Sequence, residues 1–309
     1  VYNHEKYLNE RIESILNQSF RDFEILILDD ASTDFSYKVA NKFQQHPAVT
    51  IIRNEKNSGS PFKQWQKGVA LAQGKYIWIA EGDDFAESNF LESLLHFFID
   101  EEVSLAYSAS HRIDEDGLID DEYYLKCGHY DNLIYPINHW FNDYSEIGTD
   151  EIMNALAIRN TIPNVSATLW RAKSLKTIDF DKCSTFKNAG DWYAYINLLL
   201  KGKICYKAKH LNYHRVHSTS VVAKNKKNPA DTIPDYFEIH KFITQNFTVS
   251  DDLYRLMTHS VTSGLRQIWP DLSEKAFNEL YDIEALSRIH EQKTQYTRAN
   301  VNVQEDKNR

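Results

Sequence analysis

Cysteine is scarce in this chain, with three residues in 309, and no two of them form a Cys-x-x-Cys pair. A disulfide framework uses an even set of cysteines, and a structural zinc site needs cysteines or histidines a few residues apart. Cys127, Cys183 and Cys205 indicate neither. The sequence therefore favours a protein of a reducing compartment.

Long apolar runs are also missing, because the sequence shows no signal peptide and no stretch that could span a bilayer. We expect a cytoplasmic protein, with the inner face of the membrane as the alternative location. The chain opens at Val1 without an initiator Met, and we expect that its first few residues are absent.

Positive charge is in short supply as well. The chain carries 35 Lys and Arg against 44 Asp and Glu, a formal net charge of −9. Nucleic-acid binding needs clustered Lys and Arg, and the one dense basic run covers only residues 224–227. We therefore expect no nucleic-acid partner. The remaining composition is that of a globular protein with a sizeable core.

Helical and strand patterns alternate over the first 110 residues. The strand patterns are short apolar runs, and the helical patterns carry apolar residues three or four positions apart. This alternation predicts a parallel sheet with right-handed crossovers, in which ligands bind beyond the carboxyl ends of the strands. The predicted strands cover 23–28, 49–53, 75–80 and 103–107, and the predicted helices 8–20, 35–43, 63–73 and 88–98.

The patterning changes in the rest of the chain. Residues 111–148 are rich in Asp, Tyr and Asn and indicate an irregular excursion. Asp191 opens a strong helix, and Ile204 to Tyr206 indicate an edge strand. Three further helices are predicted at about 233–247, 251–268 and 273–290, followed by a polar tail, 291–309, that we expect to be disordered.

The apolar faces of the last helices allow two interpretations. Packing against the rest of the chain is favoured, for example through Ile239 and Met257. Peripheral docking on a membrane surface or on a partner is the alternative.

Acidic residues follow two of the predicted strands. Asp29 and Asp30 come after the first apolar run, and Glu81, Asp83 and Asp84 come after the third. Carboxylates gathered at one sheet rim repel each other unless a cation lies among them. A hard cation such as Mg²⁺ or Mn²⁺ would relieve that repulsion and could bridge a diphosphate. The alternative is that each acid is a helix cap or an ordinary loop residue.

Several stretches resemble the family 2 glycosyltransferases of GT-A fold. The resemblance is dense over residues 1–110 and looser over 160–222. The family usually has Gly at the position of Ala31 and more often Asp at the position of Glu81. The matching stretches are 1–8, 14–20, 24–34, Gly59, 68–72, 74–77 and Glu81-Gly82-Asp83-Asp84.

The resemblance implies roles for the first set of residues. Tyr2 and Asp30 would hold the nucleotide base, with Asp29 beside them. Asp83 would be the metal ligand, for Mg²⁺ or Mn²⁺, and Glu81 and Asp84 would flank it.

The resemblance also implies a general base at Asp191, with Gly190 where the family often has Glu. Asp191 would take the proton of the acceptor hydroxyl, which then attacks the anomeric carbon. A helix N-terminus lowers the pKa of a carboxyl, so we expect this base to be ionised but weak. The alternative, an ordinary N-cap, is compatible with catalysis.

A loop near residue 215 combines Arg, His and hydroxyl side chains, which suit the negative charge of a departing diphosphate. Arg215, His217 and Ser220 match an Arg-x-His-x-x-Ser pattern in related members, and His217 is also a candidate metal ligand. Lys63 is a weaker candidate for phosphate contact. The alternative is a basic surface loop.

These expectations combine into one hypothesis. The fold is α/β of GT-A type, a mostly parallel sheet flanked by helices, over 1–222, with nucleotide-sugar-binding (1–110) and acceptor-binding (111–222) halves. A helical C-terminal appendage follows at 223–290. The reaction is inverting transfer from a UDP- or dTDP-sugar to a glycan or lipid-linked acceptor in bacterial surface polysaccharide synthesis. The alternatives are a non-catalytic sugar-nucleotide binder and a phosphate-receiving regulator.

Overall fold

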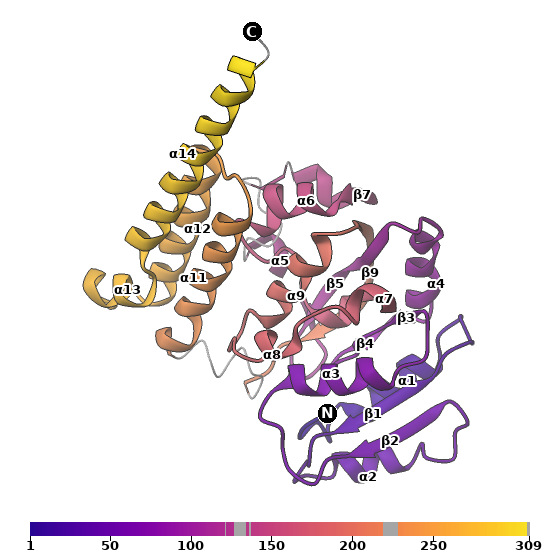
Figure 1. Cartoon of the computed structure of the whole chain (residues 1–309). Coiled ribbons are helices and arrows are strands. Elements are labelled where there is room, and N and C mark those ends of the chain that lie inside the picture. The colour runs from indigo at the N-terminus through magenta and orange to yellow at the C-terminus, as the bar shows by residue number, and fades with distance from the viewer. Residues whose placement is uncertain (121, 127–133, 136, 219–227, 308–309) are drawn as a thin grey trace.

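The molecule has two sheets wrapped by helices, and a group of C-terminal helices packs beside them (Figure 1). The α/β class predicted from the alternating patterns is confirmed. The computed structural model describes residues 1–120, 122–126, 134–135, 137–218 and 228–307.

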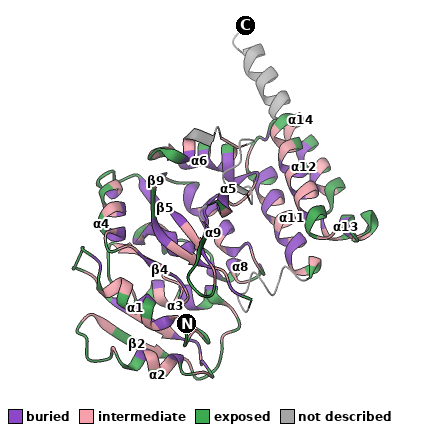
Figure 2. Cartoon of the chain, turned by 180° about the vertical axis from the view of Figure 1, so that it is seen from behind, coloured by how far each residue is buried: buried purple, intermediate pink, exposed green. Residues whose placement is uncertain are grey.

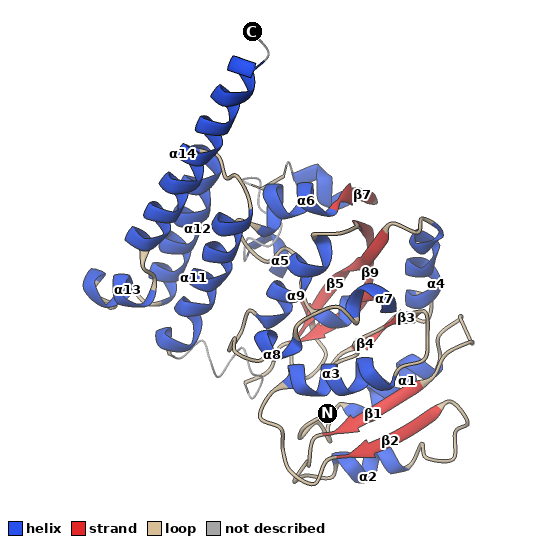
Figure 3. Cartoon of the chain, viewed as in Figure 1, coloured by secondary structure: helices blue, strands red, loops and turns tan. Residues whose placement is uncertain are grey.

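The smaller sheet and its helices are β1 (Ile25–Asp29), β2 (Val49–Arg53), α1 (Leu8–Leu16) and α2 (Ser36–Asn41). The two strands are parallel, with Ile25 opposite Val49 and Asp29 opposite Arg53. Figure 3 shows them side by side, with helices on both sides. Leu8 of α1 packs on the strand residues, and this small apolar core fixes where β1 ends.

The larger sheet contains β3 (Tyr76–Ile77), β4 (Phe85–Ala86), β5 (Val103–Ile113), β6 (Ile119–Asp120), β7 (Tyr144–Ile147), β8 (Thr168–Arg171) and β9 (Lys203–Arg215). Its order is β3-β8-β5-β9-β4, with β6 beside β5 and β7 beside β9. Only the β5–β9 pair is parallel among the described pairings of this sheet.

The prediction of a mostly parallel sheet is therefore wrong, because β3, β4, β7 and β8 all run antiparallel to their neighbours. The prediction of an edge strand at residues 204–206 is also wrong. Lysines at 203, 207 and 209 interrupt the apolar run, yet β9 extends to Arg215 and pairs on both sides.

Short helices connect these strands and cover the sheet. Several are single turns, in keeping with the irregular pattern predicted after residue 110. They are α3 (Pro61–Leu71), α4 (Phe90–Leu95), α5 (Tyr123–Lys126), α6 (Gly148–Glu151), α7 (Ala172–Leu175), α8 (Phe180–Cys183) and α9 (Gly190–Leu199).

The C-terminal helices are α11 (Pro229–Asn246), α12 (Asp251–Ile268), α13 (Glu274–Leu280) and α14 (Ile283–Lys307). Side-chain oxygens of Ser250 and Ser273 accept backbone N–H groups in the first turns of α12 and α13, which is the usual way for a helix to begin. Ile239, Ile243 and Met257 share one buried core with the residues of α9. Packing against the rest of the chain, the favoured interpretation, is confirmed (Figure 2).

The chain end differs from the expected disordered tail, because α14 continues to Lys307. Residues 283–307 contain no Pro or Gly, so nothing in that stretch interrupts a helix. Of the helices that the structure describes, none is both long and apolar enough to cross a membrane.

Candidate active site

The first acidic residue, Asp29, ends β1 and is paired. Its buried carboxylate lies 3.1 Å from Nε of Arg53 on the neighbouring strand. The chain then turns sharply at Ala31, whose φ of +58° lies in the left-handed region. Glycine adopts that region without strain, which is a physical reason for the glycine that the related family prefers there.

Asp30 holds a loop together. It is 5% exposed, and its two oxygens accept hydrogen bonds from Asn54, Ser58 and Gln64 at 2.6 to 3.0 Å. The carboxylate that was expected to hold a nucleotide base therefore has partners within the chain. Asp30 instead shapes the wall formed by residues 54–64.

The first four residues lie between the two acidic stretches. The carbonyl of Val1 accepts a hydrogen bond from the backbone of Asp30 at 2.8 Å. On the other side, a Cβ at Gly82 would lie 2.7 Å from Nδ1 of His4. The loop of residues 81–84, called the acidic loop below, therefore packs directly against residues 1–4. Tyr2 is 45% exposed, and its ring is accessible beside this rim.

The second acidic stretch forms a loop between β3 and β4. Nε2 of His217 is 3.0 Å from Oδ2 of Asp83, and Nδ1 of His4 is 3.9 Å from the other oxygen. Burial by itself would raise the pKa of Asp83. The hydrogen bond from His217 and the nearness of His4 outweigh that effect and lower the pKa to about 2. Asp83 is therefore ionised at any physiological pH.

The two acids beside Asp83 are in different surroundings. Asp84 is buried and accepts hydrogen bonds from the backbone of Arg215 at 2.8 Å and from Asn164 at 2.6 Å, so it anchors the loop. Burial and the charges of Asp83 and Asp84 raise the pKa of Glu81 well above its usual range. The backbone of Glu81 is held by the hydroxyl of Ser166 at 3.0 Å.

Sequence reasoning did not identify Asn164 and Ser166, because neither belongs to a matching stretch or to an acidic cluster. It also missed Arg11, a fully buried arginine of α1 stacked on Trp78, 4.7 Å from the ring centre. The fields of Asp84, Asp83 and Glu81 act on its guanidinium, although burial has the larger effect and lowers the pKa to about 10. Arg11 is an internal counter-charge to the acidic loop.

Asp191 lies in the first turn of α9, and the structure brings it within electrostatic range of Glu81. Its carboxylate accepts from the backbone of Trp192 at 2.7 Å and from Asn160 at 3.4 Å. Burial raises the pKa of Asp191 to about 6. The expected lowering is therefore wrong, because loss of water outweighs the helix N-terminus.

Gly190 has a steric explanation. A Cβ there would lie 2.4 Å from the ring of Phe62 and 2.6 Å from the carbonyl oxygen of Cys183. No side chain fits without displacing α3 or α8. The glutamate that the related family often carries at this position is therefore excluded by packing.

The basic candidates Arg215 and Lys63 donate hydrogen bonds to other residues of the chain. Arg215 is 5% exposed, and its guanidinium donates to the carbonyls of Asp83 and Asp114 and to the carboxylate of Glu10, at 2.7 to 3.1 Å. All three of its nitrogens donate hydrogen bonds within the chain. Arg215 therefore holds the acidic loop in place and does not present two unbonded nitrogens to a diphosphate. Lys63 is exposed and donates to a loop carbonyl at 3.1 Å. Ser220 lies outside the described residues.

A divalent cation fits this site only together with a ligand. Within the described ranges, no group of three or more His, Cys, Asp and Glu side chains could hold a metal ion alone. Asp83 and His217 supply one ionised carboxylate and one imidazole at 3.0 Å. Mg²⁺ in nucleotide sites commonly takes one or two carboxylates, with phosphate oxygens and water completing the shell. The donor set fits a cation shared with a diphosphate.

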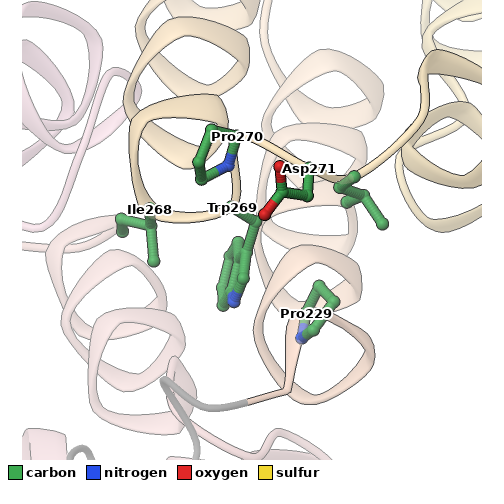
Figure 4. A pocket seen from close by; sticks show the side chains of 6 residues that line it. Pro229, Ile268, Trp269, Pro270 and Asp271 are labelled. Atoms are coloured by element: carbon green, nitrogen blue, oxygen red, sulfur yellow. The ribbon is translucent and has the colours of Figure 1, made fainter.

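A separate hollow of about 300 Å³ lies among the C-terminal helices (Figure 4). Its lining comes from the start of α11 and from the link between α12 and α13, with Trp269 at its centre and Asp271 beside it. None of the candidate site residues contributes to it. We therefore place the site at the acidic loop, residues 81–84, and not in this hollow.

Comparison with known sequences agrees with the resemblance. The protein family described as "Glycosyl transferase family 2" matches residues 1–164, more than half of the chain. The glycosyltransferase GlyG of Streptococcus pneumoniae serotype 4 is 30% identical over 115 residues, 37% of this chain and 38% of its own length. WfaP of Escherichia coli, a UDP-Glc:alpha-D-GlcNAc-diphosphoundecaprenol beta-1,3-glucosyltransferase, is 25% identical and aligns over 74% of this chain and 79% of its own.

The chain spans about two fifths of the length of the first curated relatives that it matches. Solved structures share its fold. Residues 1–349 of Staphylococcus aureus TarS in complex with UDP-GlcNAc give a TM-score of 0.65 at 16% identity, over 93% of this chain and 81% of that one. The mannosyltransferase PcManGT of Pyrobaculum calidifontis, in complex with GDP-Man and Mn²⁺, gives 0.56 at 14%, over 96% and 81%. The chain therefore belongs to glycosyl transferase family 2 and has a GT-A fold.

Proposed function

We propose that the chain transfers a sugar from a UDP- or dTDP-sugar to a hydroxyl of a glycan or lipid-linked acceptor, with inversion at the anomeric carbon. The observation that carries the proposal is that two unlike acids, Asp83 and Asp191, both lie within electrostatic range of Glu81. Asp83 is ionised and faces His217, whereas Asp191 is buried with a pKa near 6. The first suits a cation and a diphosphate, and the second suits a proton acceptor.

Asp191 is the general base in this proposal. Its carboxylate takes the proton of the acceptor hydroxyl while that oxygen forms a bond to the anomeric carbon. The bond from that carbon to the nucleoside diphosphate breaks in the same step, and its electron pair leaves with the phosphate oxygen. A single displacement of this kind inverts the configuration.

Asp83 and His217 are the residues that would hold Mg²⁺ or Mn²⁺. When bound, the cation would offset the negative charge of the diphosphate. Binding of Mn²⁺ together with GDP-Man by PcManGT supports this choice. Tyr2 is assigned to the nucleotide base, because its ring is accessible at the rim, and Asp30 to the loop behind it.

The acceptor class rests on the relatives. WfaP is named for a lipid-linked acceptor, and TarS for poly(ribitol-phosphate). Both names support an acceptor of bacterial surface polysaccharide synthesis for this chain. The regulator alternative is disfavoured, because Asp29, which would belong to the acidic pocket of such a protein, is buried and paired with Arg53.

A panel of donors tests the proposal. UDP-glucose, UDP-GlcNAc, a dTDP-sugar and GDP-mannose are compared by thermal shift with and without Mn²⁺, and the stabilising donor is then offered a GlcNAc-diphospho-lipid. A specific ligand raises the melting temperature by mass action. We expect one UDP- or dTDP-sugar to stabilise the chain more with Mn²⁺ and to be consumed with acceptor. Stabilisation without any turnover would instead identify a non-catalytic binder.

A further inference from the structure

A carboxylate from the C-terminal helices holds the backbone directly before Asp191. The turn into α9 presents three successive backbone N–H groups, those of Lys187, Asn188 and Ala189. All three donate to one atom, Oδ2 of Asp235 on α11, at 2.9, 2.6 and 3.0 Å. Asp235 is 7% exposed, so these hydrogen bonds are shielded from water.

Asn188 makes contacts in the opposite direction. Its side-chain amide donates to the carbonyl of Asp231 at 3.0 Å and to the hydroxyl of Thr232 at 3.1 Å, both in the first turn of α11. Five hydrogen bonds thus join residues 187–189 to a helix more than 40 positions later in the chain.

The same helix, α11, also packs against Trp192, the residue after Asp191. The indole of Trp192 packs edge-on against Tyr236 at 5.4 Å and His240 at 6.1 Å, and its Nε1 donates to the carbonyl of Leu156 at 2.9 Å. Helix α11 therefore contacts the chain on both flanks of Asp191. On the opposite side, Phe62 of α3 presses against Gly190.

We propose that Asp235 is a positioning residue for sugar transfer, acting through the turn 187–189 to fix the direction of Asp191. The inference rests on the proposed role of Asp191 as the base. Without an acceptor at Oδ2, three buried N–H groups lose their partner, and the turn must move to find others. A displacement of a catalytic group by about 1 Å can cost about 100-fold in rate.

Two variants of Asp235 separate the acceptor from the volume of the side chain. Asp235→Leu keeps the size and removes the oxygen, whereas Asp235→Asn keeps one accepting oxygen. The assay is UDP release from UDP-glucose and from UDP-GlcNAc with Mn²⁺ and the GlcNAc-diphospho-lipid acceptor. We expect Asp235→Leu to lower kcat about 100-fold with KM within about two-fold, and Asp235→Asn to keep most of the activity. A folded Asp235→Leu protein with kcat near the parent value overturns the inference, as does a rise in KM that accounts for the loss.

Two further variants cover a failure to fold and a general loss of stability. Asn188→Ala removes the hydrogen bonds from the Asn188 amide to Asp231 and Thr232 and keeps the backbone N–H that donates to Asp235. We expect a smaller fall in kcat at unchanged KM; an unchanged kcat contradicts the inference. Ile243→Val removes one buried methyl group from α11 without changing a residue of the turn. We expect its kcat to match the parent, and an equal loss there would mean that helix stability, not Asp235, sets the rate.

Asp191→Asn in the same assay separates this inference from the proposed function. If Asp191→Asn keeps its turnover, the base assignment itself fails. If Asp191→Asn loses turnover and Asp235→Leu does not, only the positioning role fails. Since Asp235 acts through Asp191, the double variant should be no slower than Asp191→Asn alone.

Discussion

At the scale of single residues, Asp191 combines two properties that rarely occur in an exposed carboxylate. Burial raises its pKa to about 6, which makes it a stronger base than an ordinary Asp and still leaves it mostly ionised at neutral pH. Asp191→Asn should lower turnover about 10²- to 10⁴-fold at nearly unchanged donor affinity. In the parent, kcat should fall as the pH drops through about 6, because the base becomes protonated.

The melting temperature of Asp191→Asn provides the control, because the substitution should raise stability at neutral pH while it lowers turnover. A carboxyl whose pKa is raised by folding destabilises the protein once it is ionised, and this penalty builds up between about pH 4 and pH 6. Asp191→Asn should therefore melt higher than the parent at pH 7.5 and nearly level with it at pH 4. A variant that turns over within a few-fold of the parent would reduce Asp191 to a helix-start residue.

Ala31 offers a prediction about backbone strain. A φ of +58° strains the backbone of a residue that has a Cβ. Ala31→Gly should therefore raise the free energy of unfolding, measured with urea, by about 1 kcal/mol. Ala70, exposed on α3, is the matched control, because glycine in a helix destabilises. Equal destabilisation by both substitutions would show that the strain at Ala31 is negligible.

The sequence allowed part of the site to be predicted at this scale. The contact between Asp83 and His217 agrees with the resemblance, which gave both as candidate metal ligands. Asn164 and Asp235 could not be found in that way, since Asp84, the partner of Asn164, is 80 positions away and the partners of Asp235 are 46 to 48 positions away, which leaves no periodic signal. The engagement of Arg215 with Glu10 is likewise a product of the folded chain.

At the scale of elements, the acidic loop is held from several sides before any ligand arrives. Helix α1 supplies Arg11, β9 supplies Arg215 at its end, and His217 follows two residues later. The segment before β8 supplies Asn164. Only Asp83 presents an ionised oxygen toward His217 and His4. The loop is therefore preformed, with one carboxylate left for a cation.

Asp83→Asn tests that arrangement. It removes the negative charge and keeps the shape, so we expect UDP to lose the part of its affinity that depends on Mn²⁺. Calorimetric titration of UDP with and without Mn²⁺ measures the difference, and Asp116→Asn, on the exposed turn between β5 and β6, is the control. Mn²⁺ dependence that survives in Asp83→Asn would place the cation on other ligands.

Element prediction succeeded where patterns were local. Strand β2 was predicted with its observed bounds, because Val49 to Arg53 is a short apolar run between turns. Strand β9 was cut short, since lysines interrupt it and its burial comes from β5 and β4 on either side. Its direction relative to β5 depends on a crossover of about 90 residues, which no local pattern specifies.

At the scale of the whole molecule, the C-terminal helices share a buried core with the α/β part of the chain. Ile239, Ile243 and Met257 complete the core that contains Trp192 and Tyr195. Removing residues 229–309 would expose this apolar surface and release the turn before Asp191. We expect the truncated protein to be insoluble or to bind no donor, measured by expression and thermal shift. A soluble fragment with parent-like donor affinity would show that these helices are dispensable.

The central claim is an inverting transfer with Asp191 as the base, and the configuration of the product tests it most directly. Proton NMR is recorded while the enzyme consumes UDP-glucose or UDP-GlcNAc, whichever stabilises it, with Mn²⁺ and a GlcNAc-diphospho-lipid. These donors carry the sugar in the α configuration, so a single displacement must give a β-linked product, and Asp191→Asn must give almost none. An α-linked product, or a β-linked product formed equally fast by Asp191→Asn, would contradict the account.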